Sequence, residues 1–140
     1  MSLLSDFFIA TESDALTYDG DSSFPANDRV ELRGITPLEA AGLLEALRGG
    51  GDSIEMISEF PLLTPQDAEA RTMGTPEDFV TRLAELTESA VPDIATGFAD
   101  ITVEELGWSA EDASSMVADL RMLARRAKEV KKPIFLWNSL

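Results

Sequence analysis

The residues of this chain that could do chemistry are acids in turns, a glycine run and a basic stripe, because it contains no histidine and no cysteine. It therefore lacks the usual general acid–base side chain at neutral pH and any thiolate. Ser-His-Asp and Cys-His nucleophiles, zinc motifs and disulfides are excluded. Catalysis would have to use carboxylates, Lys, Arg, Tyr18 or hydroxyl groups. We assign no catalytic residue and expect no cofactor.

The segment YDGDSSF begins like a calcium-binding loop, since Asp19, Asp21 and Ser23 alternate along it. The EF-hand pattern then requires glycine at position 6 and glutamate at position 12 of the loop. Phe24 and Val30 occupy those positions. A plain turn is the better interpretation, and we predict no metal ligand.

The run RGGGDS, residues 48–53, invites comparison with phosphate-binding loops. A Walker A motif needs a lysine that this run does not contain. A dinucleotide fingerprint needs its glycines between a strand and the following helix, whereas this run follows a predicted helix. The glycines therefore indicate the end of a helix and a flexible loop.

A basic stripe is the one candidate contact site. Arg121, Arg125, Lys128 and Lys132 recur at spacings of four, three and four along a predicted helix. The simpler explanation is favourable interaction with helix dipoles and pairing with acids elsewhere in the chain. The alternative is a site for an anion or an acidic partner, without the interleaved aromatics of a single-stranded nucleic-acid binder.

The charge of the chain is unevenly distributed. The formal net charge is −15, with 25 acidic and 5 basic residues in 1–120 and six basic residues against one acid in 121–140. The strongly acidic part of the chain, residues 1–120, should repel nucleic acid and anionic membranes and attract basic proteins. We expect no nucleic-acid partner, no membrane partner and, if a partner exists, a basic protein.

Length and hydropathy predict a single globular domain over residues 1–140, as monomer or homodimer. The sequence has no apolar run of about 18 residues, so no membrane span is predicted. Before Arg29 there is no basic residue, and Asp6 interrupts the first apolar stretch, which makes a poor signal peptide. We expect a cytoplasmic protein.

Hydrophobic periodicity and start signals predict the elements. Short β-prone or alternating segments predict strands at 6–11, 29–35, 53–60 and 134–140. Helices are predicted at 12–19 (a single turn), 36–48, from Thr64-Pro65, at 75–91 with Pro92 as its end, at 102–107 and at 110–130.

The last segment, PIFLWNSL, carries large apolar residues at successive positions. In a strand, Ile134, Leu136 and Asn138 would face one side and Phe135 and Trp137 the other. A strand that is apolar on both faces belongs inside a sheet. We therefore expect the last strand to be central or next to the first.

Together these elements predict an α+β fold, with a small mixed or antiparallel sheet of about four strands and most helices on one face. The leading functional hypothesis is a non-enzymatic protein that binds another protein, in character like small acidic inhibitors of basic toxins. One alternative is a carboxylate- or metal-dependent enzyme using Asp19, Asp21 and neighbouring acids. The other is a small-anion-binding regulatory module that uses the basic stripe.

Overall fold

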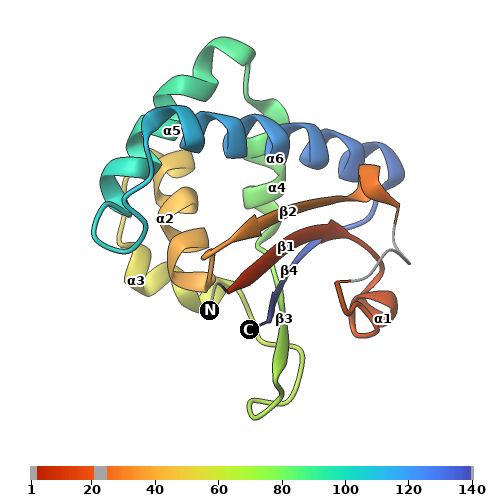
Figure 1. The fold of residues 1–140 in the computed structure, drawn as a ribbon. Helices are drawn as coiled ribbons and strands as arrows, with labels where there is room; N and C mark the ends of the chain where they lie inside the picture. Colours follow the sequence, from red (N-terminus) through yellow and green to blue (C-terminus); the bar gives the residue numbers. More distant parts are fainter. Residues whose placement is uncertain (1–2, 21–24, 140) are drawn as a thin grey trace.

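The computed structural model describes residues 3–20 and 25–139 and contains a four-stranded antiparallel sheet of order β2-β1-β4-β3 (Figure 1). Its strands are β1 (Leu4–Ile9), β2 (Arg29–Arg33), β3 (Ala70–Gly74) and β4 (Ile134–Ser139). The predicted α+β class is confirmed. The C-terminal strand lies inside the sheet, directly beside the first strand.

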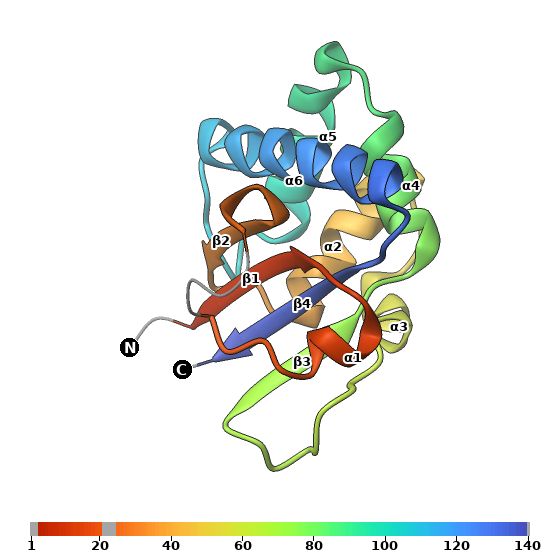
Figure 2. The same cartoon turned by 90° about the vertical axis from the view of Figure 1, so that its right-hand side faces the viewer.

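The helices of the described residues are mostly on one face of the sheet (Figures 1 and 2). They are α1 (Glu12–Ala15), α2 (Pro37–Arg48), α3 (Ser53–Met56), α4 (Glu77–Glu85), α5 (Val91–Ile101) and α6 (Ala110–Val130), with 3-10 turns η1 (Ala26–Asp28), η2 (Ile57–Glu59) and η3 (Glu88–Ala90). Helix α1 lies against the opposite face. We call the face that carries α1 the second face.

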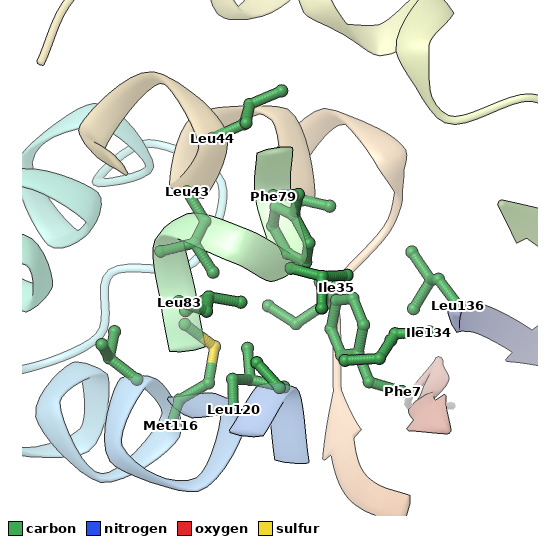
Figure 3. Close-up of a cluster of buried hydrophobic side chains, with 14 of the residues drawn as sticks. Phe7, Ile35, Leu43, Leu44, Phe79, Leu83, Met116, Leu120, Ile134 and Leu136 are labelled. Carbon is green, nitrogen blue, oxygen red and sulfur yellow. The ribbon is translucent and has the colours of Figure 1, made fainter. Parts of the chain in front are cut away.

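Two buried clusters hold the layers together. On the helical face, Phe7, Ile134 and Leu136 of the central strands meet Phe79 of α4 and Leu120 of α6 (Figure 3). On the second face, a smaller cluster contains Phe8, Ala10, Ala15, Tyr18, Phe135 and Trp137. Strand β4 therefore contributes alternate side chains to both clusters, as its sequence pattern predicted.

Local signals determine the ends of the confirmed helices. The Thr36 side chain accepts from the Leu38 N–H, and the Glu39 carboxylate accepts from the Thr36 N–H at 2.8 Å. Gly49 then ends α2 with φ of 78°. Ser109 caps α6 by accepting from the Asp112 N–H at 3.1 Å. Thr36, Glu39 and Ser109 are residue types that favour these capping positions, and Gly49 confirms that the glycine run ends a helix.

The predicted strand at 53–60 is wrong, because this segment forms α3 and η2. The Asp52 side chain accepts from the Ile54 N–H at 2.9 Å and so begins a helix. Ile54 is 71% exposed, while Met56 and Phe60 are buried. A strand would place Ile54 on the same face as Met56 and Phe60, so its exposure fits a helical rather than an extended segment.

The helix expected from Thr64-Pro65 is also wrong, since the chain turns there and enters β3. Pro92 does not end a helix but lies in the first turn of α5, a position that proline suits. The helix predicted at 102–107 is a series of turns.

Arg48 joins three helical segments at the end of α2. Its guanidinium donates to both carboxylate oxygens of Glu59 in η2 and of Asp78 in α4, at 2.8 to 2.9 Å. Hydrogen bonds from Arg48 lower the pKa of Glu59 and of Asp78 below their usual values. Their stabilising contribution is therefore present at neutral pH and is lost as pH falls through the lowered pKa values.

Candidate functional site

The two edges of the sheet differ in how they are covered. Outside β3, the preceding segment runs back along the strand. The Leu63 N–H donates to the Thr72 carbonyl at 2.8 Å, and the Gly74 N–H donates to the Pro61 carbonyl at 2.9 Å. A bridge between Leu62 and Met73 continues this pairing. The β3 edge is therefore covered by the chain itself.

The outer edge of β2 has no such cover in the described part of the chain. The Gly34 N–H donates to the Leu3 carbonyl at 2.9 Å, which fixes the phase of the β1–β2 ladder. Val30 and Leu32 consequently direct their backbone groups towards β1, and Glu31 and Arg33 direct theirs outwards. Within residues 3–20 and 25–139, these outward groups of Glu31 and Arg33 have no hydrogen-bond partner.

A groove with a volume of about 800 Å³ lies between this edge and α6. Helix α6 and strand β2 run beside each other in both views (Figures 1 and 2). Val30, Leu123 and Met122 give the groove an apolar surface, and Met122 is 63% exposed. An ion pair of 2.6 Å between Arg126 of α6 and Asp28 of η1 bridges its two walls. We call this hollow the edge groove.

The acidic and basic side chains that border the edge groove differ in whether they have an ion-pair or hydrogen-bond partner within the described residues. Asp119 and Glu129 border it from α6, and neither forms an ion pair within the described residues. The basic groups there do have acceptors: Arg29 pairs with Glu31 at 3.1 Å, Arg126 with Asp28, and the Arg125 Nε donates to the Ala84 carbonyl. The groups left to attract a partner are therefore mainly acidic.

The side chains of the predicted basic stripe extend from α6 and the residues after it towards the neighbouring helix α4, where they fall into two separate groups. The Arg121 Nε donates to the Leu86 carbonyl at 2.7 Å, and the Arg125 Nε donates to the Ala84 carbonyl at 3.1 Å. These carbonyls are at the C-terminal end of α4, where cations are favourable. Both arginines therefore cap a neighbouring helix.

Lys128 and Lys132 lie at the other end of α4. With Lys131 they border a hollow of about 480 Å³. Glu77 borders the same hollow, so its negative charge opposes the binding of an anion there. Arg121 and Arg125 therefore lie at one end of α4 and Lys128 and Lys132 at the other, so the four side chains do not form one continuous surface.

The acids of the calcium-like segment do not form a site in the described residues. Asp19 is exposed, and Asp21 lies outside the described residues. Within residues 3–20 and 25–139, no group of three or more acidic side chains is close enough to hold a metal ion.

A buried polar pair on the second face was missed in the sequence. The Tyr18 hydroxyl donates to the Asp6 Oδ2 at 2.6 Å, and both residues are 5% exposed. Arg29 Nη1 lies 3.5 Å from the Tyr18 hydroxyl, and Glu31 is opposite Asp6 on β2. The available signal was a single acid next to Phe7-Phe8, which has to find a donor once it is buried.

Burial is the main influence on both groups. It raises the pKa of Asp6 above its usual 3.8; the charge of Glu31 adds to the rise, while the Tyr18 hydrogen bond and the Arg29 charge oppose it. Burial and the hydrogen bond to Asp6 raise the pKa of Tyr18 above its usual 10.0. Because both groups are almost fully covered, the pair fastens the segment after α1 to the sheet.

We predict that Asp6→Asn becomes increasingly stable relative to the natural chain as pH rises. A raised folded-state pKa gives a stabilising contribution that is complete below the usual value of 3.8 and is lost as pH rises through the raised value. Asparagine keeps an acceptor for Tyr18 and carries no charge. Urea unfolding at a series of pH values measures the difference, and a difference that shrinks with rising pH would contradict the prediction.

Among the described helices, none is both long and apolar enough to cross a membrane. The chain matches no protein-family model, and neither a curated protein nor a solved structure is significantly similar to it, so its function has to be inferred from its own geometry.

Proposed function

We propose that this chain is a protein-binding module that takes up an extended segment of a partner protein along the free edge of β2. The observation that carries the proposal is the difference between the two edges of the sheet. The chain covers the outer edge of β3 with its own residues 61–63, while the outward backbone groups of Glu31 and Arg33 on β2 have no partner among the described residues, and Glu31 borders the edge groove.

Backbone pairing would supply the affinity. A strand added beside β2 can exchange hydrogen bonds with the N–H and C=O groups of Glu31 and Arg33. Its alternate side chains would then point to the helical side of the sheet, where Met122 and Leu123 provide an apolar surface. Pairing of this kind needs no specialised catalytic residue and fits a chain without histidine or cysteine.

Charge would select the partner. The formal net charge of −15 favours encounter with a basic protein, because long-range attraction raises association rates. At the edge groove, Asp119 and Glu129 are available to pair with lysine or arginine. We therefore propose that the bound segment alternates apolar and basic side chains.

Charged side chains on β2 have a simpler explanation as well. Arg29, Glu31 and Arg33 are the type of residue that prevents edge strands from aggregating. Protection alone does not account for Met122, an apolar side chain that is 63% exposed beside that edge. The two explanations differ in whether a specific peptide binds the backbone of β2.

Selection from a library of random peptides tests this proposal, and Glu31→Pro is the decisive variant. Proline removes an outward N–H, which an edge strand tolerates, so the fold is kept. We expect the selected peptides to alternate apolar and basic residues and Glu31→Pro to weaken their binding by about tenfold or more, the equivalent of ~1.4 kcal/mol. Glu31→Ala keeps the N–H but also loses the pair with Arg29, so it is the matched control and should bind nearly normally.

A second pair of variants tests the apolar surface. Met122→Glu places a charge in the edge groove and should abolish binding of the selected peptides. Ile54→Glu changes a similarly exposed apolar residue on α3 and should not affect binding of the selected peptides. Failure to select any peptide, or selection of peptides that bind Glu31→Pro as well as the natural chain, would refute the proposal.

A further inference from the structure

A second hollow, at the opposite end of the sheet from β2, has a volume of about 640 Å³. It lies between β3, the segment that covers β3, and the beginning of α2. Leu3, Ile57, Phe60, Leu62 and Met73 make most of its wall apolar. We call it the β3 pocket. Its volume is within the range of about 300–1,000 Å³ that is typical of small-molecule sites.

One polar side chain in this wall has an unused acceptor. Asn138 of β4 borders the β3 pocket and is 7% exposed. Its Nδ2 donates to the Ile35 carbonyl at 2.7 Å and lies 3.4 Å from the Ser5 Oγ and the Leu4 carbonyl. Within residues 3–20 and 25–139, no donor lies within hydrogen-bond distance of its Oδ1.

The absence of a donor for this oxygen is informative, because buried polar atoms in proteins almost always have a partner. The three neighbours of Nδ2 fix the orientation of the amide, since each of them is an acceptor or a hydroxyl. No described side-chain oxygen or nitrogen that is fully sealed from solvent lacks a partner. The Asn138 Oδ1 therefore has open space in front of it, and the hollow that Asn138 borders is the β3 pocket.

We infer that the β3 pocket binds a small, largely apolar molecule that carries an N–H or O–H group, and that Asn138 Oδ1 accepts a hydrogen bond from it. The apolar wall favours the body of the ligand, and the buried Asn138 acceptor fixes its orientation. Glu69 and Arg71 also border the pocket, but both side chains are exposed. A ligand without a donor would leave the amide oxygen unpaired after displacing water from it, which is unfavourable. This site does not depend on the edge groove, which lies beyond β1 and β2 in the sheet.

A pair of probe molecules isolates the hydrogen bond. Indole is apolar and has one N–H donor, and 1-methylindole has nearly the same shape without the donor. We expect saturable binding of indole at millimolar concentration, seen in the NMR signals of the Asn138 side-chain amide and the Met73 methyl group. Binding of 1-methylindole should be weaker by about three- to tenfold, the value of one hydrogen bond.

Two tryptophan variants locate the site without changing Asn138, whose amide also holds Ile35. Leu62 is 39% exposed and borders the β3 pocket, so Leu62→Trp should fill the pocket and abolish indole binding. Leu16 is 51% exposed on the surface next to α1 and does not border the pocket, so Leu16→Trp should bind indole normally.

Three results would overturn the inference: no saturable binding of indole, equal affinity for indole and 1-methylindole, or binding that survives Leu62→Trp. Equal affinity would mean that water satisfies the Asn138 Oδ1 and that the pocket selects by shape alone. Glu31→Pro should leave indole binding unchanged, so failure at the edge groove and failure at the β3 pocket are distinguishable.

Discussion

Removal of residues 134–140 is expected to leave a chain without a cooperative unfolding transition. Strand β4 lies between β1 and β3, so its loss separates β3 from the sheet and exposes the second edge of β1. It also removes side chains from both buried clusters, because Ile134 and Leu136 face the helices while Phe135 and Trp137 face α1.

The expected loss is comparable with the whole stability of a domain. The four apolar side chains of β4 are 0–5% exposed. Complete burial of each stabilises by about 1.5–3 kcal/mol, so together they contribute ~6–12 kcal/mol. Typical domains unfold with a free energy of only about 5–15 kcal/mol.

Near-ultraviolet circular dichroism and thermal melting measure this prediction. Trp108 remains after the truncation as a reporter of packing, since it contacts Phe98 with ring centroids 6.0 Å apart. Deletion of residues 139–140 alone is the control and should preserve the cooperative melt. A truncated chain that kept its near-ultraviolet spectrum and its melting transition would show that β4 is dispensable.

The sequence was sufficient to predict β4 and α6, because both carry strong local signals. Ser109 and the acids that follow it begin α6, and Pro133 separates α6 from β4. Alternation within β4 assigned each side chain to its face. Where capping, periodicity and chain breakers agree in this way, local sequence determines the element.

The secondary structure of two segments could not be predicted from the local sequence alone. The pattern of residues 53–60 alternates over only a few positions, and the Asp52 cap and the exposure of Ile54 decide in favour of a helix. Residues 70–74 have little strand character, and they become β3 because β4 and residues 62–63 pair with them on either side. Such pairing depends on residues that are distant in the sequence.

The candidate sites were less predictable than the fold, since each depends on tertiary arrangement. The free edge of β2 follows from the strand order, and the cover on β3 follows from the path of residues 61–63; neither has a sequence signature. Asp6 did have a sequence signature, because it is an acid inside an apolar run, but the residue that donates a hydrogen bond to it, Tyr18, is 12 positions away in the sequence. The residues of the basic stripe do recur at a helical spacing, but two of the four, Arg121 and Arg125, donate hydrogen bonds to carbonyl groups at the end of α4.

Tyr18→Ala is expected to destabilise the protein by about 3–5 kcal/mol, as for other buried aromatic residues. The Tyr18 ring stacks on Phe8 with centroids 4.0 Å apart and meets the edge of Trp137 at 5.4 Å. Its hydroxyl is the donor to Asp6. Because α1 has only four residues and cannot be stable alone, we also expect amide protons of residues 11–20 to lose their protection from exchange.

Tyr18→Phe separates the ring from the hydrogen bond. It keeps the packing on Phe8 and Trp137 and leaves a buried carboxyl group without its donor, which costs about 1–3 kcal/mol. Urea unfolding should therefore rank Tyr18→Phe between the natural chain and Tyr18→Ala. A loss as large for Tyr18→Phe as for Tyr18→Ala would contradict the assigned role of the ring.

The pH dependence of Tyr18→Phe tests the role of the hydroxyl. The Tyr18 hydrogen bond opposes the rise in the pKa of Asp6, so without it that pKa should rise further. A group with a raised folded-state pKa loses its stabilising contribution as pH rises, and the cost of Tyr18→Phe should accordingly be greater at pH 7 than at pH 3. In the Asp6→Asn background no charge forms, so the cost should be smaller and nearly independent of pH. Equal costs in the two backgrounds at pH 7 would mean that the Tyr18 hydroxyl does not stabilise the Asp6 carboxylate.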